Sequence, residues 1–223
     1  MGTISIEKMD HLYWLGRYTE RTYTTIREFF DGFDIMIEEP DYYITYCQYL
    51  DIPNVYESVS DFTKRYLFDM ENINSVMATL NGIYDNAVVM RDAIGTESIS
   101  YVELALSEME MAKSTAESGF LMHLQRVIDY LLAFIACIDE NVEERKIRGI
   151  FKTGKRQEKM DLLLRLRKNK EQVMKAFHML TARVLRADLP INRKAYDELS
   201  VLVNEEELCY PELITLVENL FEV

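Results

Sequence analysis

The stretch LYWLGRYTERTYTTIR, Leu12 to Arg27, places a glycine and several charges inside a helical pattern. Arg17 and Arg21 lie four residues apart, where like charges repel by roughly 0.2–0.5 kcal/mol on an exposed helix. Glycine inside a helix costs up to about 1 kcal/mol relative to alanine. Another part of the molecule must therefore offset both costs, and the most informative question is which part does so.

A second stretch, FKTGKRQEKMDLLLRL from Phe151 to Leu166, repeats the charge pattern of the first. The shared form is G-[RK]-x-x-E-[RK], and the two copies are separated by 138 residues. Its members are Gly16, Arg17, Glu20 and Arg21 in the first copy, and Gly154, Lys155, Glu158 and Lys159 in the second. Helical positions i, i+3 and i+4 share one face, so each copy presents two cations beside a carboxylate.

The repeated pattern suggests how the two copies pair. If the two helices cross at their glycines, Glu20 meets Lys159 and Glu158 meets Arg21, with approximate two-fold symmetry. Glycine at the crossing allows the backbones to approach, and the reciprocal pairs remove the like-charge repulsion. This pairing is a hypothesis for the structure to examine.

The composition favours helices throughout. Of the 223 residues, 48% are hydrophobic and 28% are charged, which is ordinary for a globular protein. Only 8 Gly and 4 Pro are present, so breaks between helices are few. No low-complexity linker divides the chain. We therefore predict an all-α fold, a single-domain helical bundle over residues 1–223 in which the two motif helices pack together.

Periodicity and stop signals locate the helices. The first runs without proline until Pro40, and the Ile52-Pro53 step ends the second, because a residue before proline avoids the helical region. Ser118-Gly119 marks a kink before a strongly apolar helix. The expected helices are 6–38, 42–50, 60–68, 74 or 75 to 94, one opening at 98 or 100, one ending near 138, 150–167, 171–186, 192–203 and 211–221.

The net charge of −13 is unevenly distributed. Residues 143–194 hold 16 Lys and Arg against 6 Asp and Glu, whereas the remainder holds 9 against 32. Such asymmetry marks a surface for an anionic partner, or basic and acidic helices that pack side by side. Neither aromatic interleaving nor a nucleic-acid motif accompanies the basic stretch, so nucleic acid is not the favoured partner.

Several observations indicate a cytoplasmic protein without metal or cofactor. The longest apolar run, Tyr130 to Ile138, is 9 residues and is typical of a core helix rather than a membrane span. The N-terminus lacks the pattern of a secretory signal. The three cysteines are widely spaced, which suits reduced thiols. None of the three histidines has Glu three residues before it, so the carboxylate-bridged metal site of helical bundles is not expected.

The motif residues resemble the signature of the alpha-E domain family, a group of all-helical bacterial proteins with a Glu-Arg motif. Three segments carry the resemblance: Leu12–Arg21, Met90-Arg91-Asp92 followed by Thr96–Ser100, and Gly154–Arg165. Lys155 and Lys159 depart from the family pattern, which has arginine there. Lysine keeps the positive charge but lacks the planar guanidinium that binds an anion through two parallel hydrogen bonds. We therefore expect the second copy to bind an anion more weakly.

The resemblance implies a pathway rather than a reaction. Family members are associated with ATP-grasp ligase-like proteins and transglutaminase-like proteins, in a suspected peptide-forming or peptide-tagging system. The expected function is an accessory protein that docks with an ATP-grasp-type ligase or presents its substrate. The candidate contacts for the partner or an anionic ligand are Arg17, Glu20, Arg21, Arg91, Lys155, Glu158 and Lys159.

Three alternatives stay open at this point. The Arg/Glu cluster can be purely structural, fixing the register of packed helices. The chain can be an enzyme of that pathway with a Ser or Cys nucleophile, although no G-x-S-x-G or phosphate-binding loop is present. It can also bind a polyanion through residues 143–194. Trp14, Tyr13 and the tyrosines of residues 42–49 are predicted to pack rather than to bind a partner.

Overall fold

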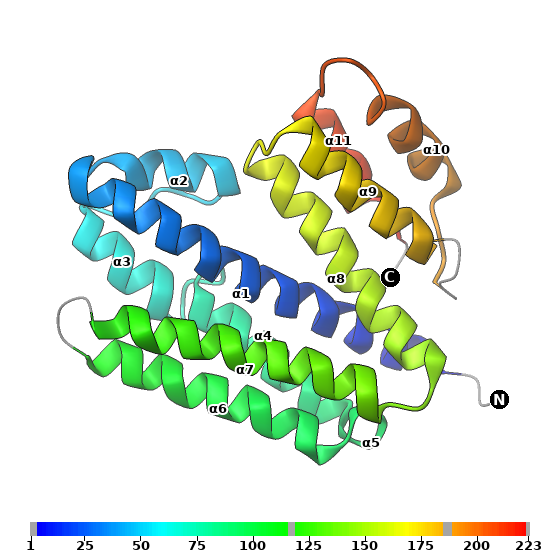
Figure 1. Cartoon of the computed structure of the whole chain (residues 1–223), viewed down its shortest axis with the longest axis horizontal. Helices are drawn as coiled ribbons and strands as arrows, with labels where there is room; N and C mark the ends of the chain where they lie inside the picture. Colours follow the sequence, from blue (N-terminus) through cyan, green and yellow to red (C-terminus); the bar gives the residue numbers. More distant parts are fainter. Residues whose placement is uncertain (1–3, 116–118, 185–188, 222–223) are drawn as a thin grey trace. The chain divides into compact units, whose positions relative to one another are not determined.

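The described residues of the computed structural model, 4–115, 119–184 and 189–221, form helices α1 to α11 and one isolated antiparallel bridge between Ile191 and Phe221 (Figure 1). The predicted all-α fold is confirmed. The chain divides into two compact units, unit 1 with Met1–Glu20 and Glu144–Val223, and unit 2 with Arg21–Glu143. The boundary falls within α1, and the single-domain organisation stays a prediction.

Helix α1, Ile6–Glu38, has the bounds that the sequence predicted. Its 33 residues contain no proline, so its length is about 50 Å at 1.5 Å per residue. Unit 1 takes the first part of this helix, including Gly16, and unit 2 takes the remainder. Each unit therefore contains a segment of α1 on which its other helices pack.

Unit 2 is built from α1 and six further helices. They are α2 (Tyr42–Leu50), α3 (Val59–Phe68), α4 (Val76–Val89), α5 (Arg91–Ile94), α6 (Thr96–Ser114) and α7 (Phe120–Asn141). Helices α6 and α7 form an antiparallel hairpin (Figure 1). The buried residues of α7, from Phe120 to Ile138, recur at helical spacing and give it one core face. Helix α7 also has the length and hydropathy of a membrane span, although 44% of its apolar window is buried inside the protein.

Aromatic rings fill the core of unit 2. The Phe62 and Tyr66 rings stack at 5.0 Å, and Phe29 stacks on Phe62 at 6.3 Å. The Tyr46 hydroxyl donates to the Thr25 carbonyl oxygen at 3.2 Å. Packing therefore accounts for Tyr46, as the sequence predicted, whereas Tyr49 of the same helix is 37% exposed.

Alkaline pH should destabilise this core. Burial raises the pKa of Tyr46 and of Tyr66 well above 10, and raises that of Cys47 from 9.0 to about 11. The folded state thus holds protons that the unfolded chain releases, so stability is complete below pH 9 and is lost as pH rises through 10. At pH 11, one unit above the ordinary tyrosine pKa, each buried tyrosine should cost about 1.4 kcal/mol. Urea unfolding at pH 8 and pH 11 measures the loss.

Two tyrosine variants make that measurement specific. Tyr66→Phe removes a buried titrating group, so the variant should lose less stability than wild type between the two pH values. Tyr49→Phe, at a tyrosine of α2 that is 37% exposed, is the matched control and should lose as much stability as wild type. An identical loss in Tyr66→Phe and wild type would contradict the assignment.

Unit 1 packs four helices with the start of α1. They are α8 (Arg145–Arg165), α9 (Lys170–Val184), α10 (Arg193–Leu202) and α11 (Tyr210–Glu218). Helix α8 packs against α9 and α11, and α10 packs against α11. The Asn192 side-chain oxygen caps α10 by accepting from the Ala195 backbone N–H at 3.1 Å. The backbone N–H of Asn192 donates to the Leu220 carbonyl oxygen at 3.0 Å.

Several predicted helix starts and ends were wrong. Ser58, not Ser60, caps α3 by accepting from the Asp61 amide. The predicted helix to residue 94 breaks at Met90, and α6 begins at Thr96 directly after Gly95, whose φ of 80° only glycine adopts readily. Helix α8 begins five residues before the predicted Ile150. The predicted kink at Ser118-Gly119 and the end near Arg186 fall partly outside the described residues.

Candidate functional site

The candidate site lies where α8 crosses the first part of α1 in unit 1. A Cβ atom on Gly16 would lie 2.1 Å from the Phe151 carbonyl oxygen, and one on Gly154 would lie 2.1 Å from the Tyr13 carbonyl oxygen. No side chain fits at either position, because each glycine touches the backbone of the other helix. The crossing is therefore the element that offsets the cost of a glycine inside each helix, and the two motif helices pack together as predicted.

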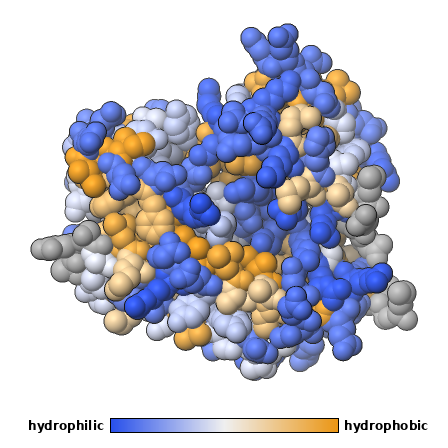
Figure 2. Space-filling view, viewed as in Figure 1, coloured by the Kyte–Doolittle hydropathy of each residue, from blue (hydrophilic) through white to orange (hydrophobic). Residues whose placement is uncertain are grey.

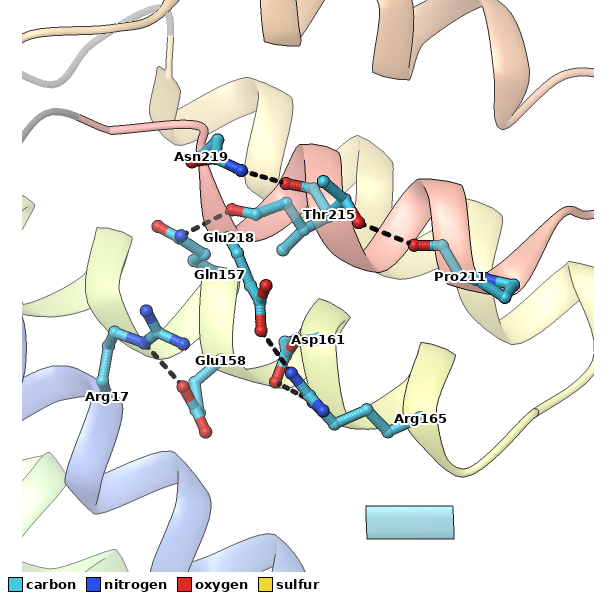
Figure 3. Close-up of polar contacts among 10 residues, drawn as sticks. Arg17, Gln157, Glu158, Asp161, Arg165, Pro211, Thr215, Glu218 and Asn219 are labelled. Carbon is cyan, nitrogen blue, oxygen red and sulfur yellow. Dashed lines mark hydrogen bonds and ion pairs between the residues drawn. The ribbon is translucent and has the colours of Figure 1, made fainter. Parts of the chain in front are cut away.

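Beside the crossing, Arg17 of α1 and Glu158 of α8 form a buried ion pair (Figure 3). The Arg17 Nε donates to the Glu158 Oε2 at 2.6 Å, and the two side chains are 11% and 1% exposed. The guanidinium also lies 5.1 Å from the Trp14 ring centre. Burial acts to lower the pKa of Arg17, but the Glu158 carboxylate outweighs it, and the pKa is raised. Arg17 is thus a fixed cation of the interior.

Tyr13 and Gln157 connect the crossing to α11. The Tyr13 hydroxyl donates to Gln157 Oε1 at 2.6 Å. Gln157 Nε2 in turn donates to the Val217 carbonyl oxygen of α11 at 2.7 Å (Figure 3). The Tyr13 ring meets the Phe221 ring edge-on at 6.0 Å. Tyr13 is 3% exposed, as expected for a core anchor. These hydrogen bonds satisfy polar groups that burial would otherwise penalise.

On another side of the crossing, Glu20 lies between two lysines of α8. The Lys155 Nζ is 3.7 Å from Glu20 Oε2, and the Lys159 Nζ is 3.7 Å from Glu20 Oε1. The Lys155 and Lys159 side chains are 16% and 32% exposed, whereas Glu20 is 9% exposed. Two cations therefore share one carboxylate, and both lysine side chains keep part of their surface in contact with solvent.

A third polar group extends the site along α8. Asp161 accepts from the Arg165 Nε at 2.9 Å, and the same guanidinium binds Glu218 of α11 (Figure 3). Burial raises the pKa of Asp161, and the neighbouring Glu158 carboxylate raises it further against the opposing effect of Arg165. Helix α8 thus carries a line of buried polar side chains from the crossing toward α11.

The structure brings together most, but not all, of the predicted site residues. The predicted contact between Glu20 and Lys159 is confirmed. Glu158 is bound by Arg17, a pair that we did not predict. The predicted pair between Arg21 and Glu158 involves residues of different units and stays a prediction. Arg91 belongs to unit 2, where it is exposed at the first position of α5.

Sequence reasoning missed Gln157 and Asp161. Together with Gly154 and Glu158 they occupy positions i, i+3, i+4 and i+7, which is one stripe of a helix. Both side chains are fully buried on that stripe. The sequence did contain a signal for them, because their spacing places these polar residues on the same face of the helix as Gly154.

The comparisons with known proteins agree with this motif. One family model matches residues 8–189, and it is described as a predicted alpha-helical domain with a conserved ER motif. Glu20-Arg21 and the crossing of α1 and α8 lie within the matched segment. No curated protein and no solved structure matches the chain. Because the match spans most of its length, the chain belongs to the Alpha-E family.

Proposed function

We propose that this chain is a non-catalytic accessory protein of an ATP-grasp/amide-ligase-linked peptide-forming or peptide-tagging system. In this role α8 binds an anionic surface of the ligase, or an anionic group of its substrate, through Lys155 and Lys159. The association with ATP-grasp ligase-like and transglutaminase-like proteins comes from the family resemblance. The chemistry of the contact comes from the charges on α8.

The charge distribution of α8 is the observation that supports this function. The helix holds eight basic and two acidic residues. Both acidic residues, Glu158 and Asp161, lie on the buried stripe. At 100° per residue, six of the basic residues fall within an arc of about 100° on the opposite side. These six residues, here called the α8 cationic stripe, are Arg145, Arg148, Lys152, Lys155, Arg156 and Lys159.

The α8 cationic stripe suits binding better than catalysis. The buried pair of Arg17 and Glu158 and the close contact of the two glycines hold the helix backbone in place, so the stripe lies on a rigid element. Lysines that share a carboxylate at 3.7 Å can also turn toward an incoming anion. Electrostatic complementarity of this kind contributes to partner choice and to the association rate.

A pull-down from the native lysate tests the partner. The tagged chain should recover an ATP-grasp-type ligase, and Lys155→Gln/Lys159→Gln should lose it. The matched control is Lys175→Gln/Lys194→Gln, which removes two exposed lysines of unit 1 outside α8 and should retain the ligase. Equal recovery by both double variants, each folded by circular dichroism, would contradict the proposed contact.

The same stripe favours a second candidate, binding of a polyanion such as RNA. Of the 16 basic residues in 143–194, eight lie on α8. Polyanion binding releases counterions, so its affinity falls steeply as salt increases, and nuclease treatment of the lysate removes the captured material. A ligase that is retained after nuclease treatment favours the accessory role over the polyanion.

A further inference from the structure

A groove of about 970 Å³ lies in unit 2, where α3, the end of α6 and the start of α7 meet. This volume is at the upper end of the range for small-molecule sites, which are mostly apolar with a few polar groups that orient the ligand. All of its described lining residues belong to unit 2. It is therefore separate from the motif of α1 and α8.

Three phenylalanines supply the aromatic part of the groove lining. The Phe33 ring of α1 meets the Phe120 ring of α7 edge-on at 5.5 Å, and Phe68 of α3 adds a third ring. Phe120 is buried, whereas Phe33 and Phe68 are only half-buried, so apolar ring surface faces the groove. Covering such surface drives the binding of an apolar body. Apolar residues also reach the surface of unit 2 outside the groove, where α1 and α7 lie side by side (Figure 2).

The rim of the groove carries cations that are scarce elsewhere in unit 2. The unit holds 7 basic and 22 acidic residues, and three of the basic residues line the groove. Arg65 is partly exposed and already has partners in the protein, because it donates to the Val55 carbonyl oxygen at 2.8 Å and pairs with Asp69 at 3.7 Å. The lining contains two acidic residues, Asp69 and Glu71, and the ion pair with Arg65 offsets the charge of Asp69. Lys64 of α3 and Lys113 of α6 are exposed, and both line the groove.

We propose that this groove binds a small apolar carboxylate, with an aryl or acyl body against Phe33, Phe68 and Phe120 and the carboxylate at Lys64 and Lys113. The concentration of cations at one apolar groove in a strongly acidic unit is the observation that selects an anion. A neutral apolar ligand would gain nothing from the two lysines, and a polyanion would be repelled by the rest of the unit. The inference does not depend on the proposed function.

Calorimetric titration of the full chain with 2-naphthoate and decanoate tests the site, with 2-naphthamide and decanamide as neutral matches. At least one carboxylate should bind about tenfold more tightly than its amide, which corresponds to about 1.4 kcal/mol. Binding should also shift the NMR signal of the [¹³C-methyl]-labelled Met70, which lines the groove, and leave that of Met179 in unit 1 unchanged. Binding of naphthoate alone assigns an aryl ligand, and binding of decanoate alone an acyl ligand.

Lysine variants complete the test. Lys64→Ala/Lys113→Ala should bring the affinity for the carboxylate down to that of the amide, whereas Lys175→Ala/Lys194→Ala should change nothing. The proposal is overturned if neither carboxylate shifts the Met70 signal, if amides and carboxylates bind equally, or if the folded Lys64→Ala/Lys113→Ala variant keeps the preference for the carboxylate.

Discussion

Replacing Gly16 or Gly154 with alanine should destabilise the protein by about 3 kcal/mol. In both variants the new methyl group would start 2.1 Å from a carbonyl oxygen of the opposite helix, a distance at which the backbones must separate. Separation would lengthen the Arg17–Glu158 and Tyr13–Gln157 hydrogen bonds on either side of the crossing. Urea unfolding followed by circular dichroism measures the loss of free energy.

Gly149→Ala is the matched control, because this glycine lies in the same helix α8 and a Cβ atom on it has nothing within 4 Å. Alanine there should stabilise the protein by up to about 1 kcal/mol, since glycine is the poorer helix former. The double variant Gly16→Ala/Gly154→Ala should cost less than the sum of the single variants, because both changes separate the same two helices. If the three single variants were equally stable, the close crossing would be wrong.

The helix bounds show what local signals could predict. Pro40 and the Ile52-Pro53 step, together with unbroken helical periodicity, gave α1 and α2 their correct ends. Met90 carries no such signal: it is 1% exposed, and its ψ of 11° breaks the helix where its side chain enters the core. The break between α4 and α5 therefore depends on tertiary packing, and the helix propensity of the local sequence could not predict it.

The start of α8 was missed for a different reason. The segment Glu143 to Arg148 is rich in charge and lies before the predicted start of the helix at Ile150. Ile147, Ile150 and Phe151 nevertheless recur at helical spacing and are buried, which makes the segment the first turns of α8. Burial of three apolar side chains outweighed the repulsion among the neighbouring cations.

The sequence predicted the helix crossing of the candidate site but not the identity of every ion pair. The repeated glycines predicted a crossing, because glycine inside a helix is costly unless a backbone approaches it. The identity of each ion pair was not predictable, since it depends on the rotation of each helix about its axis. The observed rotation buries Arg17 with Glu158, whereas Lys155 and Lys159 pair with Glu20 and stay partly exposed. That difference separates a buried ion pair from the lysines that we propose as the binding surface, within one motif.

Replacing Arg17 with methionine should destabilise the protein by about 3–5 kcal/mol, the usual cost of removing one partner from a buried ion pair. The change keeps an unbranched apolar side chain at the crossing but removes the guanidinium that donates to Glu158 at 2.6 Å. Glu158 is 1% exposed, so water cannot replace the lost hydrogen bond without opening the crossing. Denaturant unfolding reports the change as a lower midpoint with an unchanged slope.

A double-mutant cycle shows whether the loss belongs to the pair. Arg17→Met/Glu158→Met removes both charges, so it should be more stable than Arg17→Met by about 2 kcal/mol or more. Arg27→Met is the matched control: this arginine lies on α1, stacks on Tyr23 at 5.7 Å and is exposed, so its loss should cost about 0.5 kcal/mol or less. Simple additivity of the two single changes would mean that Arg17 stabilises the crossing through its contact with Trp14 rather than through Glu158.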